Sequence, residues 1–282
     1  MTVYNNKVEI QKHITKLRSQ GFTFGFVPTM GALHKGHLSL VNEALTHNDF
    51  AVVSIFVNPT QFDNPLDLEK YPRTLERDIE LLQAQSGNTI VYAPSVQDIY
   101  EGQTKAERFD FDGLEHEMEG KFRDGHFDGV GTIVKRLFEI VTPNTAYFGE
   151  KDYQQLAIIK KLVEKHALPV TIVGCEIHRD PSGLAMSSRN ERLKPDYKKE
   201  APFIYKTLLA AKKQFGTKNA KEIVEWVENE FSKHELLKLE YFIIADVTTL
   251  KSIETKQNNT NYRAFVAAYA DDIRLIDNLA LN

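Results

Sequence analysis

The amino-acid sequence predicts an α/β protein built on a doubly wound parallel sheet, with a smaller α+β part after it. Short runs of nearly uninterrupted apolar residues recur along the chain, and such runs are typical of strands that are covered on both faces. Segments with apolar residues at positions i, i+3 and i+4 alternate with these runs up to about residue 175, and they predict helices. This alternation is typical of a Rossmann-like sheet.

The apolar runs are the predicted strands, and they cover residues 22–27, 50–57, 89–92, 145–148 and 170–175. Helical spacing of apolar residues follows the first run at 38–45, precedes the fourth at 130–141 and follows it at 156–163. The stretch 62–72 contains two prolines, Pro65 and Pro72, and is predicted to be a loop that could close over a ligand as a lid.

The pattern changes near residue 178. We therefore predict a Rossmann-like domain over residues 1–178 and a smaller C-terminal α+β domain over residues 179–282. Turn-forming residues begin the second domain. They are followed by two amphipathic helical patterns and then by two strand-like segments, at 197–215, 219–234, 239–247 and 264–269.

Composition excludes several classes of protein. The 282 residues are 42% hydrophobic and 26% charged, which is typical of a folded globular protein. The formal net charge of −4 provides no general attraction for nucleic acid, and no segment approaches the roughly 20 apolar residues of a membrane span. The single cysteine, Cys175, excludes an intrachain disulfide and a cysteine-based zinc site. We expect a cytoplasmic protein that binds neither nucleic acid nor membranes, with Cys175 in the core rather than acting as a nucleophile.

The strongest motif lies where the first strand ends and the next helix begins. His34 and His37 are three residues apart on one helical turn, and Gly31 and Gly36 allow a ligand to approach the backbone. Helix N-termini favour phosphate, so a phosphate site is the preferred interpretation. Structural histidines and a metal site are the alternatives, but metal-binding helical pairs usually stand at i, i+4 and need a third ligand, for which His47 is badly placed.

Two further segments fit a phosphate ligand. Lys151 follows the fourth strand, at the edge of a parallel sheet where phosphates bind. A capping box of Asp152 and Gln155 would explain those two residues without a ligand. The loop with Ser187, Ser188 and Arg189 offers hydroxyl, backbone and guanidinium donors to a triphosphate, although taken alone it is also an ordinary polar turn.

Two segments could hold a small substrate. Asn58 and Gln61 follow the second predicted strand, and their side-chain amides could bind hydroxyl or carboxylate groups. Capping a turn is the alternative role for Asn58. Arg123 lies in a glycine-punctuated loop before a helix and is a candidate anion clamp. A solvated turn arginine is its alternative.

Taken together, five segments resemble the pantoate–β-alanine ligase (pantothenate synthetase) family. They are PTMGALHKGH at 28–37, FVNPTQF at 56–62, RDGHFDGV at 123–130, FGEKDYQQ at 148–155 and GLAMSSRN at 183–190. The resemblance covers nearly the whole chain. The first and last segments also resemble the signatures of a wider nucleotidyltransferase superfamily that includes class I aminoacyl-tRNA synthetases. A tRNA-charging enzyme is therefore one alternative function. A non-catalytic nucleotide sensor, which would bind ATP without turnover, is the other.

The resemblance implies an ATP-dependent ligation of pantoate and β-alanine through pantoyl-adenylate, with release of AMP and pyrophosphate. It places pantoate at Gln61 and Gln155, with β-alanine beside Gln61, and it makes His37 the proton donor. It also implies a homodimer and Mg²⁺, for which no protein ligand is named. The residues that it assigns to ATP are Met30, Gly31, Ala32, Leu33, His34, Lys35, Gly36, His37, Gly149, Glu150, Lys151, Asp152, His178, Met186, Ser187, Ser188 and Arg189.

The catalytic expectation follows from charge. Negative charge accumulates on phosphate oxygens as pantoate attacks the α-phosphorus, and positioned donors can offset it. The candidates for this role are His34, His37, Lys151, Ser187, Ser188 and Arg189. The chain departs from the family pattern just before Gly183, where it has Ser182 instead of an acidic residue. We expect His178 nearby to contact ATP through its backbone.

Overall fold

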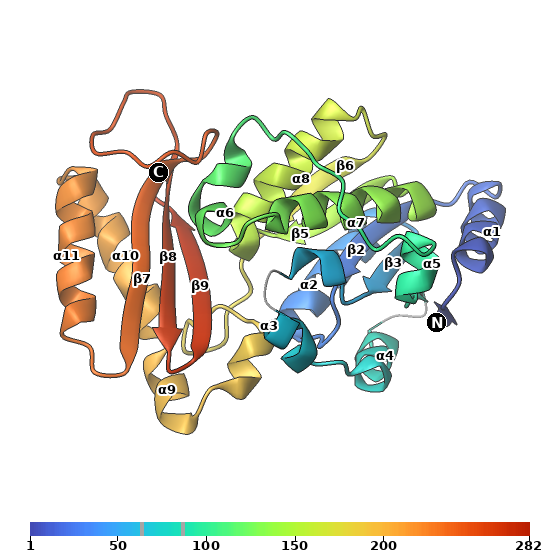
Figure 1. Cartoon of the computed structure of the whole chain (residues 1–282), viewed down its shortest axis with the longest axis horizontal. Coiled ribbons are helices and arrows are strands. Elements are labelled where there is room, and N and C mark those ends of the chain that lie inside the picture. The colour runs from blue at the N-terminus through green and yellow to red at the C-terminus, as the bar shows by residue number, and fades with distance from the viewer. Residues whose placement is uncertain (63–64, 86–87) are drawn as a thin grey trace. The chain divides into compact units, whose positions relative to one another are not determined.

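The structure is a computed structural model that describes residues 1–62, 65–85 and 88–282. Its contacts divide the chain into two compact units. Unit 1 comprises Met1–Glu150 and Gln154–Glu176, and unit 2 comprises Lys151–Tyr153 and Ile177–Asn282. Figure 1 labels the elements of both units. The three residues Lys151–Tyr153 thus group with the C-terminal part of the chain, although the flanking residues on both sides belong to unit 1.

Unit 1 contains a six-stranded parallel sheet in the order β1-β4-β3-β2-β5-β6, which confirms the predicted doubly wound α/β architecture. The strands are β1 (Thr2–Tyr4), β2 (Phe24–Thr29), β3 (Phe50–Ile55), β4 (Thr89–Tyr92), β5 (Thr145–Gly149) and β6 (Thr171–Cys175). The five predicted runs correspond to β2 through β6. The short edge strand β1 was not predicted.

Along the chain of unit 1, helices alternate with these strands (Figure 1). They are α1 (Lys7–Arg18), α2 (Lys35–His47), α3 (Pro65–Lys70), α4 (Leu75–Gln83), α5 (Val96–Tyr100), α6 (Met118–Phe122), α7 (His126–Val141) and α8 (Tyr153–Lys165). Three 3-10 turns accompany them: η1 (Pro59–Gln61), η2 (Leu114–His116) and η3 (Glu150–Asp152). The last two residues of η3 and the first residue of α8 group with unit 2. The apolar side of α2 packs on the sheet, where Val41 and Ala44 join Val27, Val53 and Val91 in one buried cluster.

The predicted loop at 62–72 is corrected in part. Residues 63 and 64 lie outside the described residues, and α3 forms over Pro65–Lys70. A proline is compatible with the first position of a helix because the N–H that it lacks has no partner there. The presence of Pro65 therefore does not make this stretch a loop.

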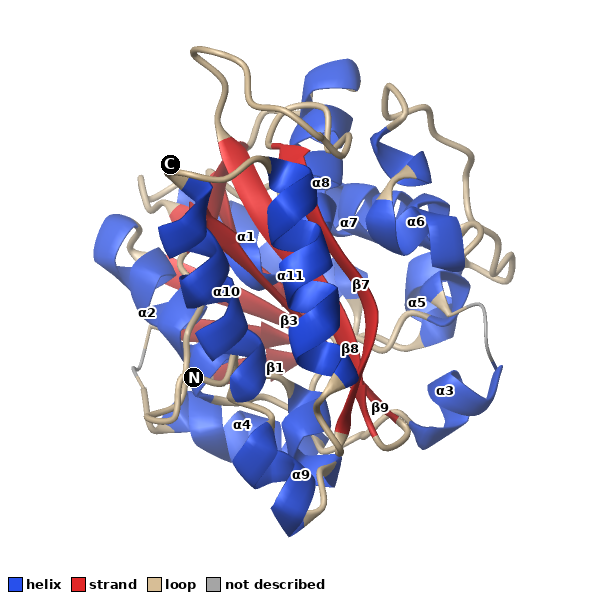
Figure 2. Ribbon diagram, turned by 90° about the vertical axis from the view of Figure 1, so that its left-hand side faces the viewer, coloured by secondary structure: helices blue, strands red, loops and turns tan. Residues whose placement is uncertain are grey.

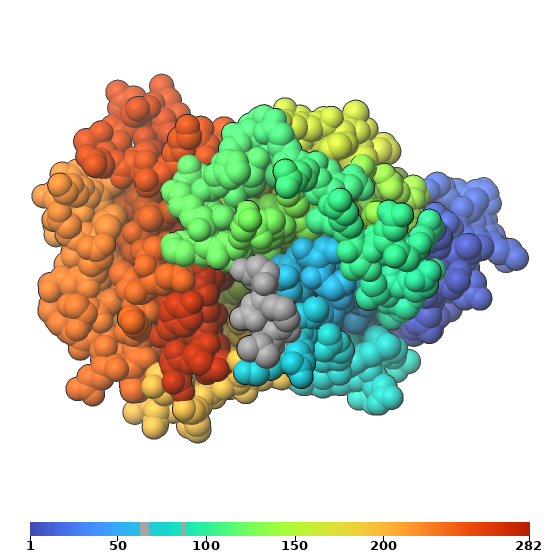
Figure 3. Space-filling model, viewed as in Figure 1, coloured from blue at the N-terminus to red at the C-terminus, as the bar shows by residue number. Residues whose placement is uncertain are grey.

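The connection over residues 101–113 runs along α7, at the surface that Figure 3 shows. The backbone N–H of Glu107 donates to Thr132 Oγ1 at 2.8 Å, and that of Phe109 donates to Asp128 Oδ1 at 3.0 Å. These bonds help to cover α7, which is buried along most of its length.

The strand order reverses between β2 and β5. From β2 the chain proceeds to β3 and β4 on one side, and later to β5 and β6 on the other. The ladder between β2 and β5 joins Gly25 to Thr145 and Phe26 to Ala146. From Val27 and Tyr147 onward, the described residues of these two strands are not paired with each other. The carboxyl ends of strands at such a reversal are where open α/β sheets bind ligands.

Unit 2 is a small α+β unit. Its antiparallel sheet has the order β7-β8-β9, formed by β7 (Leu237–Asp246), β8 (Tyr262–Ala270) and β9 (Ile273–Ala280). The helices α10 (Phe203–Phe215) and α11 (Ala220–Ser232) cover one face of this sheet (Figure 2). The short elements η4 (Ser188–Arg192) and α9 (Pro195–Glu200) precede them.

Two predictions for unit 2 need correction. The single helix predicted at 197–215 is two helices, because Pro202 lies at the junction of α9 and α10 and cannot continue the hydrogen bonding of a helix. A third strand, β9, was not predicted.

No helix in the described part of the chain combines the length and the apolar composition that crossing a bilayer requires.

Candidate active site

The turn after β2 is held by a buried carboxylate. Asp78 on α4 is 0% exposed, and it accepts the backbone N–H of Ala32 at 2.9 Å and that of Leu33 at 2.7 Å. Gly31 has φ +81°, and a Cβ there would lie 3.1 Å from Asp78 Oδ2. The sharp turn therefore requires glycine at position 31, and Asp78 fixes its geometry. Ala32 and Leu33 are among the residues that the resemblance assigns to ATP, and their backbone N–H groups are engaged by this carboxylate.

His34 and His37 form a reciprocal cap at the start of α2. The Nδ1 atom of His34 accepts the backbone N–H of Gly36 at 3.1 Å, and the Nδ1 atom of His37 accepts the backbone N–H of His34 at 3.3 Å. The ring centroids are 4.1 Å apart. A nitrogen that accepts an N–H bond carries no proton, so each neutral ring has its proton on Nε2. The cap thus orients two Nε2–H donors that stand close together.

Asn58, shortly after β3, makes side-chain hydrogen bonds to several other residues. It is 1% exposed, its Oδ1 accepts the hydroxyl of Tyr100 at 2.6 Å, and its Nδ2 donates to Gln61 Oε1 at 3.3 Å and to Gly129 O at 3.1 Å. Its amide is therefore committed to protein partners, and the cap that the sequence offered as an alternative is also present, because Asn58 precedes η1 and accepts from Thr60 N. The geometry favours Asn58 as the residue that orients Gln61.

Gln61 is fixed through both its side chain and its backbone. Its Nε2 donates to Met30 Sδ at 2.9 Å, which ties it to the turn after β2. The Nδ1 of His126 donates to the Gln61 carbonyl at 2.8 Å, and Arg123 Nη2 lies 3.5 Å from the same oxygen. Arg123 thus lies beside the segment that carries Gln61, from the loop that precedes α7.

Two adjacent glutamines follow β5, and they differ in role. Gln154 is buried and donates to Leu114 O and Glu117 O at 2.8 and 2.7 Å, so it holds η2 and the start of α6. Gln155, predicted for pantoate, is half-buried on α8. Gly149 and Glu150 lie at the end of β5, with open space around the position of a Cβ on Gly149. The sequence singled out Gln155 but not its buried neighbour.

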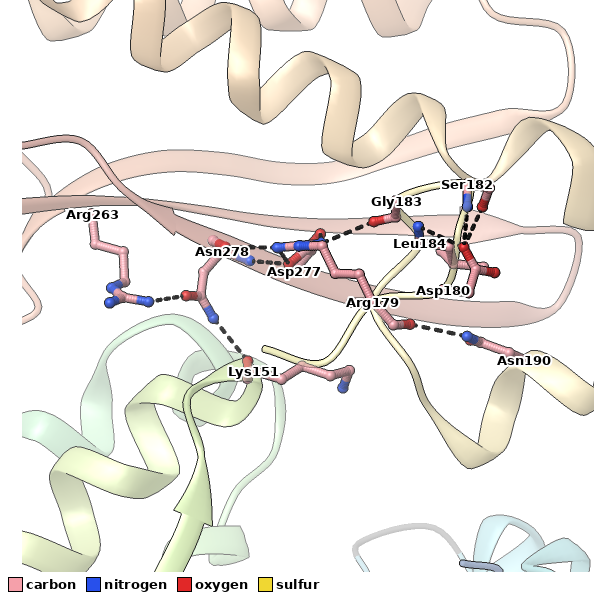
Figure 4. A network of polar contacts seen from close by, with 11 residues as sticks. Lys151, Arg179, Asp180, Ser182, Gly183, Leu184, Asn190, Arg263, Asp277 and Asn278 are labelled. Carbon is pink, nitrogen blue, oxygen red and sulfur yellow. Dashed lines mark hydrogen bonds and ion pairs between the residues drawn. The ribbon is translucent and has the colours of Figure 1, made fainter. Parts of the chain in front are cut away.

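In unit 2, Lys151 and Asp152 lie in η3, immediately before α8. The Lys151 Nζ is 3.7 Å from Asp152 Oδ2, and its side chain is 16% exposed. The backbone carbonyl of Lys151 accepts a hydrogen bond from Asn278 Nδ2 at 2.9 Å, and the side chain extends away from that contact (Figure 4).

The Met-Ser-Ser-Arg loop of unit 2 follows a short hairpin. The hairpin is closed by the N–H of Met186, which donates to the carbonyl of exposed His178 at 3.0 Å. Ser187 then caps η4, because its Oγ accepts the N–H of Arg189 at 3.2 Å, and Ser188 is the first residue of η4. Asn190 Nδ2 donates to Ala185 O at 2.9 Å and holds the loop against the hairpin. The backbone of this loop is thus fixed by internal hydrogen bonds.

Within unit 1, the structure places Met30 to His37, Asn58, Gln61, Gly149, Glu150 and Gln155 at the carboxyl ends of β2, β3 and β5, and Arg123 beside Gln61. Within unit 2, it places Lys151 and Asp152 in η3, and His178 and Met186 to Arg189 along the hairpin and the loop after it. Sequence reasoning missed Asp78, Gln154 and the residues of β9 that contact these segments.

The described residues contain no group of three or more His, Cys, Asp or Glu side chains placed to hold a metal ion. Cys175 is half-buried at the end of β6. Burial, with the nearby carboxylates of Glu43 and Glu150, raises the pKa of its thiol to about 11.

We predict slow alkylation of Cys175 in the folded protein. A thiol at its ordinary pKa of 9.0 is about one-tenth thiolate at pH 8, whereas one at about 11 is roughly one-thousandth thiolate. Iodoacetamide should therefore label the native protein about 100-fold more slowly than the urea-unfolded chain, as followed by intact mass. Equal rates in both states would contradict the raised pKa.

Comparison with known proteins finds relatives over the whole chain. Residues 2–280 match the family model described as Pantoate-beta-alanine ligase. The chain is 57% identical over 282 residues to the pantothenate synthetase of Christiangramia forsetii and 55% identical over 281 residues to that of Flavobacterium psychrophilum, with 100% of both chains covered in each case.

Solved structures agree with this result. The chain matches crystalline pantothenate synthetase from Thermus thermophilus with a TM-score of 0.91 and 39% identity, over 100% of this chain and 99% of that one. It also matches the pantoate-beta-alanine ligase from Francisella tularensis, complexed with beta-gamma ATP and beta-alanine. There the TM-score is 0.81 and the identity 37%, over 100% of this chain and 98% of that one.

Proposed function

The chain belongs to the pantoate–β-alanine ligase family and catalyses the ATP-dependent condensation of pantoate with β-alanine, and we propose that the reaction passes through pantoyl-adenylate. In the first step, a carboxylate oxygen of pantoate attacks the α-phosphorus of ATP, and the bond to the β-phosphate oxygen breaks to release pyrophosphate. In the second, the β-alanine nitrogen attacks the activated carbonyl carbon. AMP leaves with the electron pair of the broken C–O bond, and the nitrogen loses a proton.

The paired imidazoles carry the proposal for the first step. Because the backbone occupies Nδ1 in both rings, His34 and His37 each present an Nε2–H at the N-terminus of α2. Donors that are already oriented stabilise charge that develops on phosphate oxygens without a cost of reorganisation. We assign His34 to phosphate binding and His37 to proton donation from Nε2.

Unit 2 supplies the remaining donors of the proposal. Lys151 offers an ammonium, and Ser187, Ser188 and Arg189 offer hydroxyl, backbone and guanidinium groups suited to phosphate oxygens. Asp152, His178 and Met186 are further proposed ATP contacts in unit 2. In unit 1, Met30 to Gly36, Gly149 and Glu150 are the other proposed contacts. For His178 the contact is proposed through the backbone, on the side of the adenine.

Pantoate is assigned to Gln61 and Gln155, with β-alanine next to Gln61. The amide of Gln61 is pre-oriented by Asn58 and Met30, which lowers the cost of ordering it around a hydroxylated acid. Asn58 and Arg123 support the position of Gln61 from within unit 1.

The proposal also includes Mg²⁺, a homodimer and a cytoplasmic location. The described residues offer no carboxylate or imidazole cluster for a metal, so they do not fit a protein-held Mg²⁺. We propose that the ion enters with ATP, bound to phosphate oxygens, which Mg²⁺ prefers. Sedimentation analysis would test the dimer.

Isotope exchange tests the order of the two steps. With labelled pyrophosphate, ATP and pantoate, label should enter ATP in the absence of β-alanine, because activation precedes formation of the amide bond. Omitting pantoate should abolish the exchange, and mass spectrometry should detect pantoyl-adenylate on the protein. Exchange that requires β-alanine would overturn the proposed order.

A further inference from the structure

Strand β9 of unit 2 has two consecutive polar residues at buried positions. Asp277 is 5% exposed and Asn278 is 1% exposed. Burying polar side chains is costly unless each finds partners, and here both do. Their contacts reach the two segments of unit 2 that carry the proposed phosphate donors (Figure 4).

Asp277 holds the hairpin that precedes the Met-Ser-Ser-Arg loop. Its carboxylate accepts a hydrogen bond from each terminal nitrogen of Arg179, with Nη1–Oδ2 at 2.6 Å and Nη2–Oδ1 at 2.9 Å. Burial raises the pKa of Asp277, and the Arg179 guanidinium opposes that rise. Arg179 also donates to Gly183 O at 3.1 Å, and its guanidinium lies 3.7 Å from the centroid of the Tyr205 ring. The hairpin is thereby fixed to β9 by a bidentate pair with little freedom.

Asn278 holds the backbone of Lys151. Its Nδ2 donates to the Lys151 carbonyl at 2.9 Å, and its Oδ1 accepts a hydrogen bond from Arg263 Nη1. The Arg263 guanidinium in turn lies 4.2 Å from the ring centroid of Tyr153. A carbonyl can only accept and a guanidinium can only donate, so the amide of Asn278 has one satisfactory orientation.

We propose that Asp277 and Asn278 are positioning residues that set the distance between the Lys151 ammonium and the donors of residues 186–189. This inference rests on the proposed function, in which both groups bind the same triphosphate. Adjacent residues of one strand hold both segments, so a shift of that strand would move the two segments together. Catalysis by positioned donors is sensitive to such shifts, since a displacement of about 1 Å can cost about 100-fold in rate.

The test removes the Asn278 donor and keeps the rest of its environment. In Asn278→Asp, an oxygen replaces Nδ2, so the Lys151 carbonyl loses its donor while Arg263 keeps its acceptor. Asn278→Ala, a second variant, lacks both groups and adds no charge. The matched control is Asn282→Ala, which also removes one donor and one acceptor of an asparagine in unit 2. There Nδ2 donates to Thr260 O at 2.8 Å, and Oδ1 accepts the backbone N–H of Tyr262 at 2.7 Å. Pantoate-dependent exchange is measured as kcat and as KM for ATP, with melting temperature recorded for each variant.

We expect kcat/KM for ATP to fall about 10- to 100-fold in both Asn278 variants and to stay within about twofold in Asn282→Ala. A double-mutant cycle with Lys151→Ala separates positioning from a general structural role. If Asn278 acts through Lys151, replacing Asn278 in the Lys151→Ala background should change the rate by about twofold or less. Equal losses in both backgrounds, or near-normal kinetics in folded Asn278 variants, would overturn the inference and leave the proposed function intact. Near-normal exchange in Lys151→Ala itself would overturn both.

Discussion

Replacing His37 by asparagine is expected to slow pantoate-dependent ATP–pyrophosphate exchange by about 100- to 1,000-fold while the protein stays folded, which is the usual cost of losing one oriented donor to a developing charge. An asparagine Oδ1 stands roughly where the histidine Nδ1 does, so it can still accept the His34 N–H and preserve the cap of α2. It has no group at the position of Nε2. The variant therefore separates the capping role of His37 from its proposed chemical role.

Two companion variants make this experiment decisive. His37→Gln places an amide N–H near the position of Nε2 and should recover part of the lost rate. His47→Asn is the matched control, because His47 ends the same helix and its Nδ1 contacts the Glu43 carbonyl and carboxylate in the last turn, far from the cap. It should exchange at the normal rate. A folded His37→Asn protein with normal exchange would refute the assignment of His37, and a large loss of melting temperature would assign it to capping instead.

The sequence predicts the parallel sheet well because its central strands are covered on both faces. Ala51, Val52 and Val53 in β3 are each 0% exposed, and such a strand is visible as an apolar run. The edge strand β1 has three residues, one of them exposed, so it leaves no such run. The periodicity in α7 and α8 is visible for the same reason as β3, since both helices bury a continuous apolar stripe.

Strand β9 escaped prediction for a reason that also matters for function. Its buried positions include Asp277 and Asn278, which interrupt the apolar pattern by which a strand is recognised. The same two residues make the contacts with Arg179 and Lys151. Polar residues at buried positions obscure a secondary-structure pattern because their partners are chosen by the tertiary fold.

The candidate site also contains residues whose partners only the tertiary fold determines. The glycines and histidines of residues 31–37 indicate a ligand site because their pattern lies within one short stretch of sequence. Asp78 shapes that turn from 45 and 46 residues further along the chain. Its only signal in the sequence is a carboxylate four residues before Leu82, on the side of α4 that becomes buried. Local spacing cannot show which loop such a carboxylate will meet.

Replacing Gly129 by alanine is expected to destabilise the protein by about 3 kcal/mol and to lower kcat/KM for pantoate about 100-fold. A Cβ at position 129 would lie 2.3 Å from the carbonyl oxygen of Thr60 and 2.8 Å from the Cα of Gln61. Both are backbone atoms, so rotating a side chain cannot relieve the overlap. The η1 turn has to move away from α7.

That movement would act on Gln61 in particular. Asn58, which orients the Gln61 amide, also donates to the carbonyl of Gly129, and His126 donates to the carbonyl of Gln61. Separating η1 from α7 therefore strains one hydrogen bond that holds Asn58 and one that holds the backbone of Gln61. The loss should appear mainly as a raised KM for pantoate, with KM for ATP changed much less, because the ATP contacts assigned above do not include Gln61. Urea titration gives the change in stability, and initial rates at varied pantoate and varied ATP give the two constants.

Gly216 provides the matched control, because its φ is −67° and a Cβ placed there would have no atom of the other described residues within 4 Å, apart from its own chain neighbours and helix backbone. Gly216→Ala should therefore be neutral, or stabilising by up to about 1 kcal/mol, with unchanged kinetics. If Gly129→Ala matched Gly216→Ala in stability and in KM for pantoate, the close contact between α7 and η1 could not be what positions Gln61. A Gly129→Ala protein that raised both KM values equally would indicate a diffuse disturbance of unit 1 rather than a displaced pantoate site.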